Sequence, residues 1–286
     1  MEDHAFTLMP MSQEISLDPG TTYEGHITVT NPADASSDFS YKVSVDPYGV
    51  SGEKYDVDLL TQYNRSLITE WITIDHPTGT LKPNESKQIN YTIKVPKNAP
   101  AGGQYAAITV AEDNATQGND NVIVSSVLEM ASVVYAKVAG ETNHDGKVLE
   151  NNIPSFVTST PVTIGALISN EGNVHEAANF TISVTDLFTG QVILPGDDSA
   201  GRYSEIIMPE TTYRSERVVG NLPAVGVVKI NQTIRYNGEV SITERDVVIC
   251  PIWFMALMAL TLCAFIAVIV TIIRKHRKRK KSRPAL

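Results

Sequence analysis

Short segments in which apolar and polar residues alternate follow one another through most of the chain, and this period of two is typical of half-buried β-strands. The clearest example lies between Ile89 and Val95, where every second residue is apolar. Turn residues such as Asp18-Pro19-Gly20 separate the segments. The pattern predicts strands at 23–29, 39–45, 89–95 and 104–110, an apolar edge at 71–74, further strands at 162–168 and 180–184, and two strand pieces around Gly226 between 222 and 235.

A polar segment, Glu112–Asn121, interrupts the strand pattern near the middle of the chain. We interpret it as a long hairpin loop rather than a domain linker. The segment after it, Val122–Ala139, is rich in valine, which favours a strand over the alternative of a helix. This strand would return to close the first sheet, so we expect a domain boundary near Gly140.

The two halves of the chain show a faint internal similarity. Gly25 to Asn31 followed by Phe39-x3-Val43 parallels Gly165 to Asn170 followed by Phe180-x3-Val184. Many short strands at this spacing indicate an all-β protein. We therefore expect two tandem Ig-like β-sandwiches, at 1–139 and 140–246.

The stretch Val247–Ile273 contains no charged residue. As a helix it would reach about 40 Å, against about 30 Å for the hydrocarbon core of a bilayer. Its length and the lack of a polar stripe favour a transmembrane helix at 247–273 over a buried core helix. Pro251 suits the first helical turn, and Trp253 would lie at the depth of the membrane interface.

The tail at 274–286 begins with Arg274 and Lys275 and holds eight of the chain's 23 basic residues. Nucleic-acid binding is one interpretation of such a run. Next to a membrane span, basic residues more often mark the cytoplasmic side, where they also contact anionic lipid. This predicts a single-pass plasma-membrane protein with the tail in the cytoplasm and 1–246 outside.

The part of the chain before Val247 is strongly acidic. All 32 acidic residues but only 15 of the 23 basic residues precede Val247, so this part carries a net charge of −17. Such a charge disfavours binding to nucleic acids and other polyanions. The two cysteines, Cys250 and Cys263, both lie in the apolar stretch, so we expect no disulfide outside it. That composition fits a Gram-positive bacterial surface, and it also fits a cytosolic protein.

The start of the chain, at 1–6, has neither a basic n-region nor an apolar h-region. An exported N-terminal part of this size needs a signal, so we expect that a signal was removed or that the start is truncated. The alternative is a tail-anchored protein with its domains in the cytosol, which would contradict the charge rule.

Signals of catalysis and of metal binding are weak. The sequence has no Gly-x-Ser-x-Gly elbow, no His-Glu-x-x-His motif and no phosphate-binding glycine loop. Glu141, Asn143, Asp145 and Gly146 imitate the start of a calcium loop, but Asn152 stands where the bidentate glutamate is needed. We interpret this segment as an Asp-Gly turn, and the sequence predicts no enzyme activity, no metal and no other cofactor.

Several motifs carry a resemblance to a known family. Leu17-Asp18-Pro19-Gly20 followed by a strand ending in Thr30-Asn31-Pro32, the segment Gly79–Ser86, and Ala101–Tyr105 resemble the first domain of the WxL-interacting proteins of Gram-positive bacteria. The turn Asn170-x-Gly172-Asn173-x-His175 resembles their second domain. The resemblance implies two Ig-like extracellular domains, a first domain that binds peptidoglycan, a second domain that engages a host protein, and partnership with WxL-motif surface proteins.

We expect a non-enzymatic surface protein that binds cell-wall peptidoglycan, a surface protein, or both. Tyr48, Tyr55 and Tyr63 lie in irregular sequence where we expect exposed rings that suit sugars, whereas Trp71 is expected in the core. Binding loops on such scaffolds are held by rigid strands. The alternative is a tail-anchored cytosolic adaptor that resembles the major-sperm-protein-like domains and binds peptides.

Overall fold

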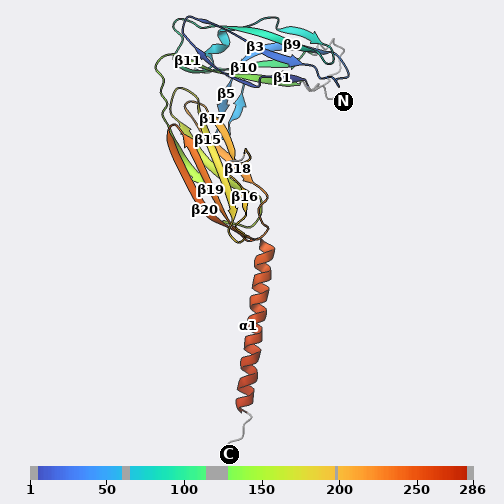
Figure 1. The fold of residues 1–286 in the computed structure, drawn as a ribbon, viewed down its shortest axis with the longest axis vertical. Coiled ribbons are helices and arrows are strands. Elements are labelled where there is room, and N and C mark those ends of the chain that lie inside the picture. Colours follow the sequence, from blue (N-terminus) through green and yellow to red (C-terminus); the bar gives the residue numbers. More distant parts are fainter. Residues whose placement is uncertain (1–5, 60–64, 114–127, 197–198, 282–286) are drawn as a thin grey trace, which may run out of the picture. The chain divides into compact units, whose positions relative to one another are not determined.

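The structure of the 286-residue chain is a computed structural model, and it describes residues 6–59, 65–113, 128–196 and 199–281. Within these residues the chain is all-β apart from a short 3-10 turn, Leu67–Glu70, and one long C-terminal helix (Figure 1). It forms two compact units. Unit 1 comprises 1–147, 168–177 and 206–214, and unit 2 comprises 148–167, 178–205 and 215–286.

Unit 1 is built on a β-sandwich whose two sheets face each other across an apolar core. One sheet has the order β1-β3-β9-β7, and the other β2-β11-β10-β4-β8. The strands are β1 (Thr7–Met9), β2 (Ser12–Leu17), β3 (Thr22–Thr30), β4 (Phe39–Pro47), β7 (Ile72–Ile74), β8 (Thr78–Leu81), β9 (Ser86–Lys94), β10 (Gly102–Glu112) and β11 (Glu129–Val138), with a separate ribbon of β5 (Gly49–Ser51) and β6 (Asp56–Asp58).

The period-two pattern determines which side chains form this core. Along β9, Ile89, Tyr91 and Ile93 point inward and are almost fully buried, while the residues between them face away. Trp71 lies at the edge of the same core, as the sequence predicts. The expected returning strand is also present, because β11 pairs antiparallel with β10 over its described length. Most of the expected hairpin loop, Glu112–Asn121, lies outside the described residues.

Unit 2 rests on a second sandwich, whose sheets have the orders β12-β14-β18 and β13-β20-β19-β15-β16, with β17 also paired to β15. Its core contains Val184, Val228, Ile230 and Val247. The strands are β12 (Gly146–Asn152), β13 (Phe156–Val157), β14 (Val162–Asn170), β15 (Glu176–Asp186), β16 (Val192–Leu194), β17 (Arg202–Ile207), β18 (Thr211–Val219), β19 (Gly226–Tyr236) and β20 (Glu239–Ile249).

The internal similarity has a structural counterpart in two asparagines that follow or end a strand. The side-chain amide of Asn31 donates to the carbonyl oxygens of Ser37 and Leu81, both at 3.0 Å. The amide of Asn170 donates in the same way to those of Val174 and Ile207, both at 2.9 Å. In each case one buried amide ties a turn to the end of another strand, which satisfies carbonyl groups that leave their ladders.

Among the sequence-based boundaries that differ from the structure, two lie within the β-rich part of the chain. The expected division at Gly140 differs because 168–177 and 206–214 pack with the first half of the chain in unit 1. The two strand pieces expected around Gly226 are one strand, β19, which begins at Gly226. In both places the local pattern was sound, but long-range packing sets where each unit or strand begins and ends.

The apolar stretch that begins at Val247 serves two elements. Val247 and Ile249 are buried in the core of unit 2 at the end of β20, and the helix α1 (Ile252–Lys281) begins only at Ile252. The expected transmembrane segment therefore starts five residues later than its apolar composition indicates. A buried strand end and a lipid-facing helix are equally apolar, so composition does not separate them.

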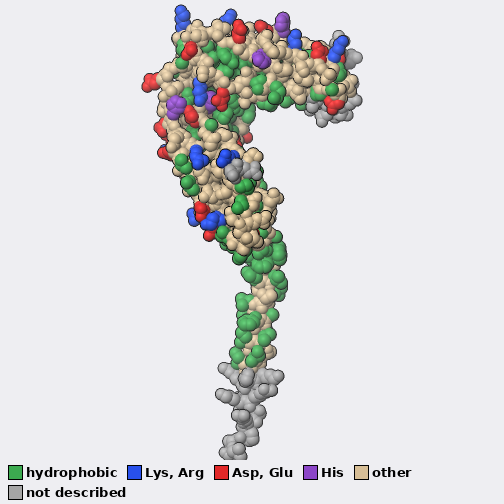
Figure 2. All heavy atoms as spheres, in the orientation of Figure 1, with side chains coloured by type: hydrophobic (Ala, Val, Ile, Leu, Met, Phe, Trp, Pro, Cys, Tyr) green, Lys and Arg blue, Asp and Glu red, His purple; other side chains and the backbone are tan. Residues whose placement is uncertain are grey.

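Helix α1 is long and apolar enough to cross a bilayer from Ile252 to Arg274, with a mean hydropathy of 2.8 in its most apolar window. None of that window is buried against the rest of the protein, and Figure 2 shows the helix covered by hydrophobic side chains. Pro251 lies directly before it, and the Pro251 carbonyl accepts hydrogen bonds from the N–H groups of Phe254 and Met255, at 2.9 and 3.0 Å. This position suits proline, whose missing N–H has no helical partner there.

Candidate functional site

The outer face of the sheet β4-β10-β11, turned away from the core of unit 1, carries an aromatic cluster. Strand β10 is buried on both faces from Gly102 to Val110. Tyr105 and Tyr135 lie opposite each other on this outer face, with ring centroids 5.9 Å apart in an edge-on arrangement. Met208 and the ring of Tyr48 complete the contact. The cluster explains why 206–214 belongs to unit 1, since this segment covers aromatic surface that would otherwise face water.

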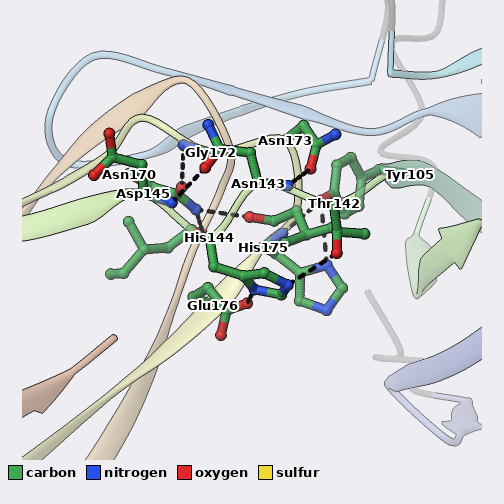
Figure 3. A network of polar contacts seen from close by, with 12 residues as sticks. Tyr105, Thr142, Asn143, His144, Asp145, Asn170, Gly172, Asn173, His175 and Glu176 are labelled. Atoms are coloured by element: carbon green, nitrogen blue, oxygen red, sulfur yellow. Dashed lines mark hydrogen bonds and ion pairs between the residues drawn. The ribbon is translucent and has the colours of Figure 1, made fainter. Parts of the chain in front are cut away.

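His175 is buried beside this cluster and is bonded to it (Figure 3). The Tyr105 hydroxyl accepts a hydrogen bond from the backbone N–H of His175 at 3.0 Å and lies 3.2 Å from His175 Nδ1. The tautomer of the neutral ring decides which of the two, the Tyr105 hydroxyl or Nδ1, donates in this second bond. Burial, with a smaller effect of nearby Lys137, lowers the pKa of His175 to about 4.

Two loops, 141–145 and 170–176, are joined by a polar network, and Figure 3 labels many of its residues. Asn173 lies at its centre, since its side chain accepts from Asn143 N at 2.8 Å and donates to Glu141 O at 3.0 Å. Gly172 fits closely here, because a Cβ at this position would lie 2.3 Å from Asn143 O. The segment that imitates a calcium loop is therefore a brace between loops. Among the described residues, no group of three or more His, Cys, Asp or Glu side chains is placed to hold a metal ion.

A small pocket of about 200 Å³ opens beside the aromatic cluster. Arg65 lines it, donating to Asn173 O at 3.1 Å and forming an ion pair with Glu210. Because both contacts hold the guanidinium against 170–176 and 206–214, Arg65 stabilises the packing of these segments on unit 1. The pocket is lined by Val50, Arg65, Tyr105, Met208, Pro209, Glu210 and Thr211.

The irregular segment that contains Tyr48 and Tyr55 is packed rather than free. Both tyrosines are half-buried, so the expectation that their rings are exposed is wrong. The Tyr55 hydroxyl accepts from Met208 N at 2.9 Å and lies 2.6 Å from Thr211 Oγ1, and burial raises its pKa. Glu53 in the same segment receives Arg214 Nε at 2.6 Å. These contacts hold the ribbon β5–β6 against 206–214.

An acidic groove of about 600 Å³ lies farther along the same outer face. Ser44 and Asp46 reach it from β4, Glu129 comes from the start of β11, and Asp58 comes from the ribbon. Ser44 Oγ donates to Asp46 Oδ2 at 2.8 Å, which orients that carboxylate. Among the residues that the structure describes, no basic side chain lines the groove, whose walls are Ser44, Asp46, Ser51, Val57, Asp58, Leu59 and Glu129.

The sequence-based site residues are only partly brought together. Tyr48 and Tyr55 lie on the ribbon side of the aromatic cluster, and whether they bind a partner stays a prediction. Tyr63 lies outside the described residues. Of the expected anchor residues, Trp253 is exposed at the start of α1, Arg274 is exposed near its far end, and Lys275 belongs to the same helix.

Sequence reasoning missed the residues that line the groove. The alternation in β4 could have indicated two of them. Ser44 and Asp46 alternate with the apolar Val43 and Val45, so both polar side chains are expected on the face turned away from the core. No local signal joins them to Asp58 and Glu129, which are brought near by strand pairing and by the ribbon. His175 is buried although its turn sequence is polar, so the local sequence gives no sign of its burial.

No protein-family model and no curated protein matches the sequence. Solved structures with a similar fold include a chain of a chaperone–tip adhesin complex for CFA/I fimbriae biogenesis (13% identical, covering 84% of this chain and 98% of that chain, TM-score 0.41). The class 5 fimbriae chaperone CfaA (13%, 84% and 99%, TM-score 0.40) and a chain of the CsuC–CsuE pre-assembly complex of Acinetobacter baumannii (13%, 84% and 98%, TM-score 0.40) are similar to the same extent. These likenesses concern the β-sandwich fold and carry no conclusion about function.

Proposed function

We propose that this protein is a non-enzymatic, membrane-anchored cell-surface protein whose unit 1 binds cell-wall peptidoglycan through the acidic groove. The observation that carries the proposal is the groove itself, about 600 Å³ in size, whose described walls hold three carboxylates, two hydroxyls and no basic side chain. The resemblance to the WxL-interacting proteins points to the same ligand. The second proposed partner, besides peptidoglycan, is a surface protein, for example one with a WxL motif.

The chemistry of the groove matches a ligand that donates hydrogen bonds. Ionised carboxylates act only as acceptors, and bonds to them are stronger than bonds between neutral groups. Sugar hydroxyls and peptide amino groups, both present in peptidoglycan, are donors of this kind. A phosphate-rich wall polymer would instead be repelled by the groove and by the net charge of −17 before Val247. Recognition is therefore by shape and hydrogen bonding rather than by attraction to a polyanion.

We propose, in addition, that α1 spans the plasma membrane with the basic tail in the cytoplasm and both units outside. The 23 residues from Ile252 to Arg274 reach about 35 Å as a helix, enough to cross the hydrocarbon core. Eight basic residues after the apolar stretch favour the cytoplasmic side for the tail. Protease added to intact cells is expected to remove both units and leave the tail. Full protection of the units would instead favour the cytosolic adaptor.

Binding by the groove is testable with purified peptidoglycan sacculi and the full chain in detergent micelles. Replacing Asp46 and Asp58 together by asparagine is expected to weaken binding about tenfold or more, since hydrogen bonds to charged groups contribute about 1.5–3 kcal/mol each. Asp34→Asn combined with Asp38→Asn is the matched control, because it removes the same charge from an exposed loop of unit 1 that does not line the groove.

The wall material separates the possible outcomes. Binding that survives removal of anionic wall polymers and moderate salt supports the proposal. Binding only to unstripped wall, abolished by modest salt, would show that charge attraction to polyanions dominates. Absence of binding to either material would exclude the glycan and leave a protein partner.

A further inference from the structure

Three loops and the chain leading to α1 meet at one end of unit 2. Strand pairing places them there: Gly226 at the start of β19 lies opposite Ile249 at the end of β20, and Phe156 of β13 pairs with Val248. Asp186, the last residue of β15, lies opposite Val228. The loops at 158–161, 187–191 and 220–225 therefore surround the point where β20 ends. We call this end the base of unit 2; β19 and β20 are labelled in Figure 1.

The base exposes large apolar side chains that the core of unit 2 does not use. Phe188 is 76% exposed at the tip of the loop after β15. The exposed apolar residues of the base include Phe156, Leu187, Phe188, Val192, Val218 and Val248. No charged residue occurs at 153–162, 187–195, 218–228 or 247–251. An apolar surface without charges is costly in water unless something covers it.

The loop that carries Phe188 is firmly held. Asp186 Oδ1 accepts from the N–H groups of Phe188 and Thr189, at 2.8 and 3.0 Å. These two bonds lower the pKa of Asp186, so the carboxylate stays ionised. The backbone of Asp186 also bonds to Gln191 and Gly190, and Leu187 N donates to Val227 O at 3.0 Å. The exposed position of the Phe188 ring is thus set by a structured turn.

The short connection to α1 limits how far the base lies from the membrane. Only Cys250 and Pro251 separate Ile249, the last residue of β20, from Ile252, the first residue of α1. Three residue steps reach at most about 11 Å. If Ile252–Arg274 spans the hydrocarbon core, Ile249 lies within this distance of the interface whatever the tilt of unit 2. The headgroup layer on each side is about 5–8 Å thick.

We propose that the base of unit 2 inserts into the headgroup region of the same bilayer that α1 spans, with Phe188 as its principal contact. This proposal rests on the proposed membrane span. We assign lipid as the occupant because the connection between β20 and α1 is only two residues long. It keeps the base next to the bilayer in every orientation of unit 2. Aromatic side chains prefer this interface, and the residues at 187–191 and 220–225 carry no charge that would lose solvation on entering it. The ionised Asp186 precedes them at the end of β15, where the N–H groups of Phe188 and Thr189 bind its carboxylate. The contact seats unit 2 on the membrane.

The test uses the full chain in phosphatidylcholine vesicles whose acyl chains carry bromine, which quenches tryptophan at short range. Trp71→Phe leaves Trp253 as the reporter of the span. Trp71→Phe/Trp253→Phe/Phe188→Trp reports the base. Trp71→Phe/Trp253→Phe/Val240→Trp is the matched control, because Val240 is also exposed and apolar, at 54%, but lies at the other end of β20. Eight residues of strand, or about 27 Å, separate Val240 from Val248.

The proposal expects quenching and a blue-shifted emission for the tryptophans at 253 and 188, and neither for the one at 240. Quenching at 253 without quenching at 188 overturns the contact while the span stands. No quenching at 253 overturns the span and, with it, the contact. Equal quenching at 188 and 240 also overturns the proposal, because unit 2 would then lie flat on the bilayer. A blue-shifted but unquenched emission at 188 would also overturn the proposal, because a second copy of the chain rather than lipid would then cover the base.

Discussion

Replacing Tyr105 by alanine is expected to lower the free energy of unfolding of unit 1 by about 3–5 kcal/mol. The Tyr105 side chain is fully buried, and its ring contacts Tyr135 and His175 edge-on, at 5.9 and 5.5 Å between centroids. Removing it leaves a cavity between the sheet and the segments 168–177 and 206–214. Urea unfolding of the full chain in detergent micelles measures the loss, with Trp253→Phe as background so that only Trp71, in the core of unit 1, reports.

Tyr105→Phe separates the ring from its hydroxyl. It keeps the packing but leaves the N–H and Nδ1 of His175 without the partner they have in the native structure. An unsatisfied buried polar group costs about 1–3 kcal/mol, so the phenylalanine variant should lie between wild type and alanine. Equal stability of wild type and phenylalanine variant would show that the Tyr105–His175 contact contributes nothing.

Lowering the pH from 6.5 to 4 is expected to destabilise unit 1 by about 3 kcal/mol through His175 alone. The pKa of His175 is about 4 in the folded chain, against about 6.5 in an unfolded chain. Between these values the unfolded state binds a proton that the folded state does not. This contribution is therefore fully present above pH 6.5, is lost progressively as the pH falls, and changes no further below about pH 4.

The measurement compares urea midpoints of wild type and His175→Gln at several pH values in that window. The glutamine variant should be less stable at pH 7 but should lose less stability on acidification. His26→Gln, which changes an exposed histidine of the same unit, serves as control and should follow the wild-type pH profile. A glutamine variant with the full wild-type pH dependence would contradict the assignment to His175.

The acidic groove shows why a binding site is harder to anticipate than a fold. Ser44 and Asp46 are polar residues in an alternating strand, and this pattern predicts only that they face away from the core. Asp58 and Glu129 join them because the ribbon β5–β6 and the start of β11 lie over the same sheet face. Such neighbours are far apart in sequence, so no spacing rule places them together.

The tyrosines illustrate the opposite error. Tyr48 and Tyr55 lie in sequence without a clear period, from which exposure was expected. Aromatic side chains bury a large apolar area. The rings of both tyrosines therefore pack against segments from elsewhere in the chain that provide a surface for them. Tyr55 bonds to Met208 and Thr211, about 150 residues away along the chain. Trp71, flanked by a clear apolar run, was placed correctly in the core.

The sequence by itself determined several of the strands, among them β3, β4, β9, β10 and β15, together with the all-β class and the existence of a long apolar helix near the end of the chain. These follow from local periodicity and from runs of one residue type, which neighbouring residues are enough to define. Only the tertiary structure decided that 168–177 and 206–214 belong to unit 1, that β20 ends before α1 begins, and that carboxylates from β4, β6 and β11 share one groove. Those features depend on which distant surfaces bury each other, and the free energy of that burial is not a property of any single segment.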